Sequence, residues 1–548
     1  MINGHYPYVA PQLSVRHMNK RPDLKSHYDF IVCGSGSSGS VVAGRLAANP
    51  EVNVLLLEAG GNDDVPLVRE ASKWPMNLGT ERDWGFKDQP NSHLNGRAIG
   101  LSMGKVLGGG SSINALAWAR GHKNDWDFFA SEAGDPAWGY ESVLNIYRRI
   151  EDWHGPPDPK YRGDGGPVFV QPAQDPNPIA PAMVEGARSV GIPTFESHNG
   201  RMMEGDGGAA IIELRVRDGE RLSAFRTYVV PRMDQPNLTV LTHALVTRVT
   251  FIGTRATGVE IFYQDKIQSI EAHCEVVLSL GAIHTPKTLM LSGIGDRAEL
   301  QRLGIPVLQH LPGVGQNFQD HVAFDCVWES REPLAPRNNG GEATFFWKSN
   351  PNLATPDLQA CQTEFPKSSP ENAAKFGLPE SGWALFGGIV RPKSRGRVRL
   401  TSRDPHSAIQ IESNLLSHPD DLKAGVACVE LCREIGNSAP LRPFTKREAM
   451  PGNLKGGELE TFVRNAAMSY WHQTCTAKMG RDKVSVVDGN LRVYGVEGLR
   501  VADGSIMPRV TTGNTMAPCM IIGERAAELL QAEHNLAGSK GRLDLAVA

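Results

Sequence analysis

The first clear pattern of apolar and polar positions lies between Tyr28 and Gly61. A continuous apolar run from Phe30 to Cys33 predicts a buried strand, a helical pattern covers Ser38 to Ala48, and a second apolar run from Asn53 to Leu57 predicts another strand. A glycine-rich turn joins the first strand to the helix. Together the three elements predict a βαβ unit, which is the building block of parallel sheets.

The turn has the sequence GSGSSG, which suits a dinucleotide-binding loop. Gly34 permits the tight turn, Gly36 lets the backbone approach a pyrophosphate, and Gly39 allows close packing of helix on strand. Glu58 ends the second strand, where a carboxylate accepts hydrogen bonds from ribose hydroxyls and repels the 2′-phosphate of NADP. Such a loop can be a purely structural turn, but the agreement of strands, helix and acid predicts a dinucleotide site. The motif does not separate NAD from FAD.

Two later regions carry other patterns. Between about residues 326 and 465, the segments GGEATFFWKSN, SGWALFGGIVRPKSRGRVRLTSRDP and SAIQIESNLL alternate between apolar and polar residues and are bounded by proline and glycine, which predicts antiparallel strands. Near the carboxyl end, MAPCMIIGERAAELLQA has helical spacing with Pro518 in its first turn. An α/β fold is expected, with a Rossmann-like domain and a second domain built on an antiparallel sheet with helices.

Composition limits the size, partners and cellular site of the protein. A chain of 548 residues with 40% hydrophobic and 21% charged residues is long enough for two domains. A formal net charge of -3 without a long basic run disfavours nucleic acid and anionic membranes as partners. No apolar segment reaches membrane-spanning length, and residues 1–27 lack the apolar core of a signal peptide. A cytoplasmic protein without membrane insertion is expected.

The cysteines give no sign of a metal site or of disulfides. All eight are scattered without framework spacing, so free thiols are expected. Cys428 and Cys432 share a helix face, but no second pair or nearby histidine completes a zinc site. The sequence therefore predicts no metal.

A second glycine-rich strip runs from Gly104 to Asp127, GKVLGGGSSINALAWARGHKNDWD. A flexible loop is one interpretation, but the apolar residues Ile113, Leu116 and Trp118 that follow the glycines indicate an ordered segment. Three successive glycines let the backbone lie against a large planar ligand. A flavin is such a ligand, and the strip therefore disfavours an NAD-dependent dehydrogenase.

This strip resembles the first signature of the glucose-methanol-choline (GMC) oxidoreductases, which are FAD-dependent enzymes that oxidise alcohols. The second signature of that family is matched by Gly281 to Gly295, GAIHTPKTLMLSGIG, where Thr288 replaces a usually aliphatic residue. The similarity continues through the pair Asp320 and His321 and ends in the segment from Gly498 to Leu530. It covers nearly the whole chain in the family's order.

The resemblance implies a discontinuous FAD-binding domain assembled from residues 28–165, 225–325 and 466–537. Residues 166–224 and 326–465 form the substrate-binding domain in this division. The positions that match FAD contacts in the family are Gly34, Gly36, Ser37, Ser38, Gly39, Glu58, Ala59, Trp84, Gly104, Gly109, Asn114, Ala115, Leu116, Ala117, Val246, Trp471, Asp503, Gly504, Thr515 and Met516.

The same resemblance assigns these contacts to parts of the cofactor. The pyrophosphate is expected beside Ser37 and Ser38, and the adenine beside the backbone of Val246. The isoalloxazine ring is expected near Trp84 and the second glycine strip. Some members tether FAD through a histidine directly before the asparagine that matches Asn114, but Ile113 stands there. Dissociable FAD is therefore expected.

The stretch SYWHQTCTAKMG, residues 469–480, places His472 close to Cys475. These residues alone leave four interpretations open: a metal ligand with Cys475, the base for a cysteine nucleophile, a base for an external substrate, and a packed core histidine. The resemblance selects the third, because His472 and Asn514 match the family's catalytic pair. His472 is expected to take the hydroxyl proton and Asn514 to bind the substrate oxygen, while flavin N5 takes the hydride. The other histidines considered, which show no partner pattern, are His17, His243, His284 and His321.

The expected substrate is an uncharged primary or secondary alcohol with an apolar or aromatic portion. Choline-type members use a glutamate just after the Asp-His pair to hold a quaternary ammonium, whereas Ala323 stands at that position here. Oxygen or another electron acceptor is expected as the second partner. A choline-type alcohol oxidase and an FAD-containing hydroxynitrile lyase remain as alternatives, and the oligomeric state is not predicted. The aromatic candidates for the pocket wall are Phe324, Trp328, Phe345, Phe346, Trp347 and Phe365.

Overall fold

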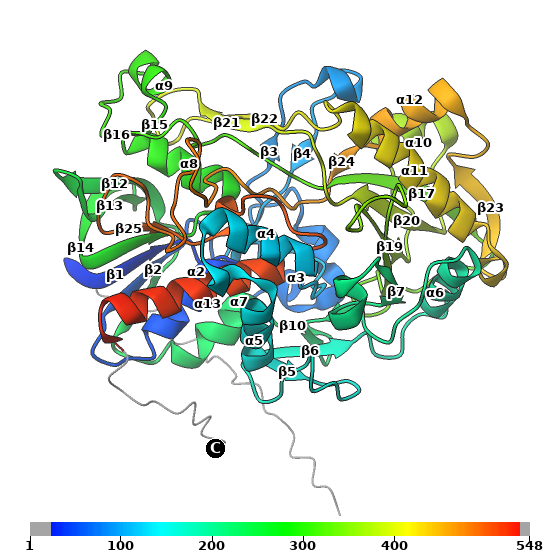
Figure 1. Ribbon diagram of the computed structural model, residues 1–548, viewed down its shortest axis with the longest axis horizontal. Coiled ribbons are helices and arrows are strands. Elements are labelled where there is room, and N and C mark those ends of the chain that lie inside the picture. The colour runs from blue at the N-terminus through cyan, green and yellow to red at the C-terminus, as the bar shows by residue number, and fades with distance from the viewer. Residues whose placement is uncertain (1–23, 537–548) are drawn as a thin grey trace, which may run out of the picture.

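The computed structural model describes residues 24–536, and two seven-stranded sheets carry most of the fold (Figure 1). The first sheet has the strand order β11-β2-β1-β14-β13-β12, with β25 added beside β14. Its strands are β1 (His27–Cys33), β2 (Val54–Leu57), β11 (Leu238–Leu241), β12 (Leu245–Ile252), β13 (Arg255–Tyr263), β14 (Lys266–Leu278) and β25 (Leu499–Val501).

The predicted βαβ unit forms the centre of the first sheet. Strands β1 and β2 pair in parallel with Ile31 opposite Leu55, and helix α2 (Ser37–Leu46) connects them. Strands β11, β14 and β25 extend this parallel part, whereas β12, β13 and β14 form an antiparallel meander. The amino-terminal prediction is therefore confirmed to within a few residues at each boundary.

The predicted carboxyl-terminal helix is also present, as α13 (Met516–Glu533). It lies alongside α2, so the two ends of the described chain pack together (Figure 1). Gly523 makes this approach possible, because a Cβ added there would lie only 2.7 Å from the Ser38 carbonyl oxygen and from the Val41 Cβ. A buried ion pair between Arg45 and Glu524, at 2.9 Å, fixes the register of the two helices.

The second sheet has the strand order β23-β17-β20-β19-β18-β7, with β24 beside β17. All of these pairs are antiparallel, as the alternation predicts. The strands are β7 (Gly208–Ile211), β17 (Val322–Ser330), β18 (Ala343–Trp347), β19 (Leu358–Thr363), β20 (Gly382–Ile389), β23 (Thr445–Met450) and β24 (Met468–Ser469). Helices α6 (Ile179–Ser189) and α11 (Pro419–Gly436) cover one face of this sheet.

Side chains of β17 alternate between the two faces of the second sheet. Phe324 and Trp328 point toward α11, where glycines make room for them. A Cβ added at Gly425 would lie 2.9 Å from the Phe324 ring, and one added at Gly436 would lie 2.1 Å from the Trp328 ring. The opposite face carries Ala323, which packs in a cluster with the side chains of residues 386 and 470.

The remaining elements connect and cover the two sheets. The other helices are α3 (Pro66–Arg69), α4 (Lys123–Ala133), α5 (Tyr140–Ile150), α7 (Ala224–Tyr228), α8 (Gly281–Leu291), α9 (Arg297–Arg302), α10 (Pro370–Phe376) and α12 (Gly456–Ala466). Strand β17 runs across the expected domain crossing at residue 325. Strands β21 (Arg397–Leu400) and β22 (Ile409–Glu412) form a hairpin apart from the second sheet, and Leu400 belongs to the core of the first.

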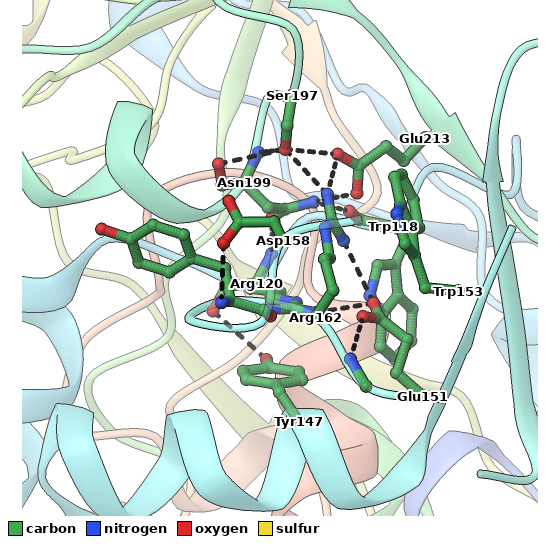
Figure 2. A network of polar contacts seen from close by, with 12 residues as sticks. Trp118, Arg120, Tyr147, Glu151, Trp153, Asp158, Arg162, Ser197, Asn199 and Glu213 are labelled. Atoms are coloured by element: carbon green, nitrogen blue, oxygen red, sulfur yellow. Dashed lines mark hydrogen bonds and ion pairs between the residues drawn. The ribbon is translucent and has the colours of Figure 1, made fainter. Parts of the chain in front are cut away.

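A buried network of charges continues from the second glycine strip (Figure 2). Glu151 forms an ion pair with Arg120 Nη2 at 2.6 Å and accepts a hydrogen bond from Arg162 Nη1 at 3.1 Å, and Arg162 also pairs with Glu213. Asn199 joins the two layers, because its amide donates to the Trp118 carbonyl and to Glu213, each at 2.7 Å. The network ties the end of the strip to β5 (Glu151–Trp153) and β8 (Glu213–Leu214).

Residues 24–536 contain no helix that is long and apolar enough to cross a bilayer. All eight cysteines are free thiols. No group of three or more histidine, cysteine or acidic side chains within the described part of the chain is arranged to bind a metal ion.

Candidate active site

A cavity of ≈ 280 Å³ lies where the first glycine turn, the second glycine strip and the open face of the second sheet meet. His472 and Asn514 line it, together with every expected cofactor contact except Gly39 and Val246. The sequence-predicted site residues are therefore brought together from segments as far apart as Gly34 and Met516. Other lining residues include Trp74, His284, Asn339, Cys361, Phe365, Lys367, Phe386 and Tyr470.

Glycines at three positions shape the narrow end of the cavity. A Cβ added at Gly109 would lie 2.8 Å from the Gly36 Cα, and one added at Gly104 would lie 2.3 Å from the Gly109 carbonyl oxygen. A Cβ at Gly36 would project into open space. The two strips therefore form a bare backbone cradle beside the amino end of α2, where no side chain caps the helix. Free N–H groups at such a helix end attract a phosphate.

Gly39 and Val246 are the two expected cofactor contacts that do not line the main cavity. A Cβ at Gly39 would lie 1.9 Å from the Gly34 carbonyl oxygen, so this glycine serves the contact between α2 and the turn. Val246 lines a smaller cavity of ≈ 30 Å³ together with Ala59 and Trp84, both of which also line the main cavity. Trp84 therefore lies at the junction of the two cavities, on the side of Val246. Its ring makes a T-shaped contact with the His284 ring, with 4.1 Å between the ring centres.

Glu58 lies at the bottom of the cradle with both carboxylate oxygens engaged. Ser35 Oγ donates to Glu58 Oε2 at 2.6 Å, and the Gly60 N–H donates to Oε1 at 2.8 Å. Burial raises the pKa of this carboxyl, and the hydrogen bonds from Ser35 and Gly60 oppose the shift. The side chain is held in one orientation toward the cavity.

The second glycine strip is fixed by the side chain of Asn114. Its Oδ1 accepts from Arg221 Nη1 at 2.9 Å and from the Leu116 N–H at 3.1 Å. Leu116 has a φ of 66°, a conformation that costs a bulky residue energy and that these contacts stabilise. The backbone of residues 114–117 is therefore presented to the cavity in a set geometry.

The side chains of His472 and Asn514 meet in the cavity. His472 Nε2 lies 3.4 Å from Asn514 Nδ2. Gln359 Nε2 donates to Asn514 Oδ1 at 3.2 Å, which fixes the orientation of the Asn514 amide so that its NH2 group faces the histidine.

The other ring nitrogen of His472 contacts a second histidine. His472 Nδ1 lies 2.8 Å from His321 Nδ1, and the two rings are nearly perpendicular. Sequence reasoning gave His321 no role, because its position after Asp320 indicated only a turn. The contact joins residues that are 151 positions apart, and no spacing in the sequence reveals it.

Asp320 clamps the segment that carries His472. It accepts from the His472 N–H at 2.8 Å and from the Ser469 hydroxyl, which in turn accepts from the Trp471 N–H at 2.8 Å. Burial raises the pKa of Asp320 to about 7. Trp471 has a φ of 61°, so the clamp maintains a turn that the backbone would not otherwise favour.

Burial also sets the charge state of the histidine pair. It lowers the pKa of His472 well below its ordinary value, with a smaller contribution from His321, and it lowers the pKa of His321 to about 3. Both rings are therefore neutral near pH 7, and each carries one proton.

Cys475 stands apart from this chemistry. Its thiol is buried, lies 3.2 Å from Thr474 Oγ1 and does not line the cavity. Burial raises the pKa of the thiol to about 12, so it is not a thiolate at neutral pH. The structure gives no support to a cysteine and histidine dyad. His243 is exposed and His17 lies outside the described residues.

The aromatic residues in the wall toward the second sheet differ from most of those expected from the sequence. Of the aromatic candidates, only Phe365 lines the cavity. Phe324, Trp328 and Phe345 are buried in the core of the second sheet, because they point to the helix-covered face. The aromatic lining comes instead from Trp74, Phe386, Tyr470 and Trp471, with Tyr470 stacked on His472 at 5.2 Å.

Comparison with known proteins gives the family. The sequence profile of the GMC oxidoreductases matches residues 28–323 with its amino-terminal part and residues 392–523 with its carboxyl-terminal part. An oxygen-dependent choline dehydrogenase of Brucella anthropi is 36% identical over 541 residues, covering 93% of this chain and 97% of the relative. The crystal structure of pyridoxine 4-oxidase from Mesorbium loti superposes with a TM-score of 0.87 and 30% identity, covering 93% of this chain and 99% of that one.

The chain belongs to the GMC oxidoreductase family. It is an FAD-dependent enzyme that oxidises CH–OH groups. A formate oxidase variant from Aspergillus oryzae, solved in a study of FAD modification, also shares this fold, with a TM-score of 0.84, 25% identity and coverage of 93% of this chain and 99% of that one.

The residues of this GMC chain fit FAD. The bare cradle at Gly36 and Gly109 leaves space that any side chain would fill, and it faces the uncapped amino end of α2. The fixed backbone of residues 114–117 lines the same cavity. Ile113 also lines the cavity, and its aliphatic side chain has no atom that can bond covalently to a flavin.

Proposed function

We propose that this enzyme oxidises an uncharged primary or secondary alcohol with an apolar or aromatic portion to the carbonyl compound, with His472 as the base. The observation that supports this most directly is a buried neutral histidine whose Nε2 lies 3.4 Å from the Asn514 amide inside the cavity. A neutral imidazole accepts a hydroxyl proton, and an amide N–H donates to the same oxygen.

The His321 contact allows the tautomer that the proposed base requires. Two Nδ1 atoms at 2.8 Å share one proton, so one ring donates and the other accepts. His472 can act as a base at Nε2 only if its own proton is on Nδ1, which then donates to His321 Nδ1. His321 would carry its proton on Nε2, which is buried. His321 is thus a positioning residue that leaves His472 Nε2 free to accept.

Asn514 would orient the substrate oxygen. Because Gln359 holds its Oδ1, the Nδ2 group is the part that faces His472 and the reacting hydroxyl. The alkoxide that forms as the proton leaves would then be stabilised by a donor already in position. The aromatic side chains of residues 470 and 471 line the same cavity.

Bound FAD would accept the hydride from the carbinol carbon. The chain's own contribution is to bind it through the backbone cradle, Glu58, Asp503 and the amino end of α13. That helix end carries a positive dipole, which stabilises negative charge beside it. We propose that FAD is held without a covalent bond, because Ile113 occupies the position of the tethering histidine.

The substrate assignment is supported by the apolar character of the wall and by Ala323. This residue is completely buried behind Phe386 and Tyr470 and offers no carboxylate to a cation. Choline dehydrogenases are among the relatives at 36% identity. The missing carboxylate nevertheless favours a neutral alcohol over choline in this chain.

The test is anaerobic reduction of the purified flavoprotein with a panel of alcohols, followed by absorbance at the flavin bands. The wild type should bleach, and His472→Ala should slow bleaching by roughly 10²-fold or more, the scale of general-base loss. His154→Gln, at an exposed histidine that lines neither cavity, is the matched control and should bleach like the wild type.

Each outcome has a defined meaning. Near-normal bleaching in His472→Ala would refute the base assignment, and choline outperforming neutral alcohols would refute the substrate assignment. A wild type that no alcohol reduces, but that cleaves a cyanohydrin, would indicate the lyase alternative. Admission of air after bleaching distinguishes an oxidase, which regains its colour at once, from a dehydrogenase.

A further inference from the structure

Lys367 places a positively charged ammonium group in the aromatic wall of the cavity. It follows β19 and lines the cavity with Phe386 and Trp471. Its Nζ lies 3.6 Å from the centre of the Phe386 ring and 4.7 Å from that of the Trp471 ring. Trp471 directly precedes the proposed base, so the ammonium belongs to the substrate end of the cavity.

The ammonium has no hydrogen-bonding partner of its own among residues 24–536, and no carboxylate there lies within 4.0 Å of it. The aromatic faces take part of its charge, but they leave N–H donors free. Other lysines near acids on this protein do form short pairs, such as Lys393 with Asp420 at 2.7 Å. Lys367 is therefore a donor directed at the cavity.

Asp325 explains how a cation is tolerated at this place. It lies on β17 directly opposite Phe386 of β20, so its carboxylate is on the same face of the sheet as the Phe386 ring. It is buried, and neither of its oxygens has a hydrogen-bond partner within the described part of the chain. Its charge attracts Lys367 and opposes the effect of burial on the pKa of both groups.

The chain of contacts also gives the position of Lys367 relative to the base. The Tyr470 ring stacks on His472 at 5.2 Å, the Phe386 ring lies 4.4 Å from Tyr470, and Lys367 lies on Phe386. Two rings therefore separate the ammonium from the proposed base. An aromatic alcohol with its hydroxyl at His472 would direct its far side toward Lys367.

We propose that Lys367 is a specificity-determining residue that donates a hydrogen bond to an acceptor on the alcohol substrate, at the side remote from the reacting hydroxyl, and that repels a cation from that position. This rests on the proposed function and sharpens it: the substrate is a neutral alcohol whose apolar or aromatic body carries a carbonyl, ether or similar oxygen. A quaternary ammonium would meet a like charge at the wall where Ala323 already removes its counter-charge.

The experiment compares matched compounds with the FAD-loaded enzyme and with Lys367→Met, which keeps most of the length of the side chain and removes its donors. The probes are benzyl alcohol, 4-(hydroxymethyl)benzamide and choline in anaerobic flavin reduction. Lys367→Met should lose about 10-fold or more in kcat/KM for the benzamide, since a hydrogen bond from a charged donor is worth this much. Benzyl alcohol should change less than about 3-fold, and choline should improve.

Two further measurements separate this inference from the proposed function. Calorimetric titration with 4-methylbenzamide, which has no reacting hydroxyl, should give a dissociation constant about 10-fold weaker in Lys367→Met. Lys367→Arg should recover most of the loss, and Lys375→Met, an exposed lysine over Phe376 on α10, should match the wild type. An unchanged dissociation constant and unchanged selectivity in Lys367→Met would overturn the inference, even if alcohol oxidation is established.

Discussion

At the scale of single residues, the chemistry depends on which ring nitrogens of two buried histidines carry protons. A sequence can indicate His472 by its resemblance, but the residue that contacts its Nδ1 is His321, which no pattern in the sequence singles out. The sequence does not single out Asp320 or Gln359 either. Each comes from a distant segment and holds one of the two proposed catalytic residues in place. The sequence therefore predicts the proposed base and misses the residues that hold it in place.

Cys475 stands at a backbone position that suits glycine better than a residue with a side chain. Its φ of 76° lies in the left-handed region, which costs a side chain of this kind roughly 1 kcal/mol or more. Cys475→Gly should relieve that strain and lose a small buried group, so we expect a stability change within about 1 kcal/mol. Flavin reduction should be unchanged.

The comparison variant is Cys475→Val, whose β-branched side chain is poorly suited to a positive φ and should cost roughly 1–3 kcal/mol. Urea unfolding followed by circular dichroism measures stability, and anaerobic bleaching measures the chemistry. Loss of bleaching in a well-folded Cys475→Gly protein would show that the thiol takes part in the reaction.

At the scale of elements, a strand that is buried on both faces limits what its sequence can reveal. The pattern indicates where the second sheet's strands lie, but β17 and β20 are buried at nearly every position. Alternation then no longer tells which side faces a ligand. Phe324 and Trp328 point under α11, whereas Asp325, beside them in the sequence, belongs to the cavity side. Only the pairing register of β17 with β20 shows which of these side chains share a face of the sheet.

The buried charge network beyond the second glycine strip gives a prediction at this scale. Glu151 is completely buried and serves both Arg120 and Arg162. Glu151→Gln keeps the shape but leaves Arg120 without a carboxylate and Arg162 with Glu213 alone, so unfolding should become easier by about 3–5 kcal/mol. Because Arg120 belongs to the second glycine strip, which lines the cavity, the variant should also retain less FAD.

The control is Glu185→Gln, which removes an exposed carboxylate paired with Arg188 on α6. A surface pair of this kind contributes about 0–1 kcal/mol, so its unfolding curve should overlap that of the wild type. Urea midpoints and flavin content per mole of protein are the readouts. Equal urea midpoints for both variants would mean that the charge network does not contribute to the stability of the folded state.

At the scale of the whole molecule, the cavity exists only because distant segments meet. The first turn, the second strip, α8, the second sheet and the start of α13 all contribute to its lining. Family resemblance predicts this assembly from the sequence in outline, including the discontinuous first domain. It does not predict that the hairpin of β21 and β22 bridges the two cores, with Leu400 in the first and Val398 and Ile411 in the second, because that depends on packing between segments that carry no motif.

Because FAD would contact segments from both ends of the chain, its binding should stabilise the molecule as a unit. Ligand that binds only the folded state stabilises it by about 2.7 kcal/mol at 100 times its dissociation constant. We expect a chaotrope to release the flavin, as Ile113 offers no covalent attachment. The unfolding temperature of the resulting apoprotein should rise with the logarithm of added FAD. FMN, which lacks the adenosine that Glu58 and Val246 would contact, should raise it less. Flavin that stays with the denatured polypeptide, or an unfolding temperature independent of added FAD, would contradict dissociable binding.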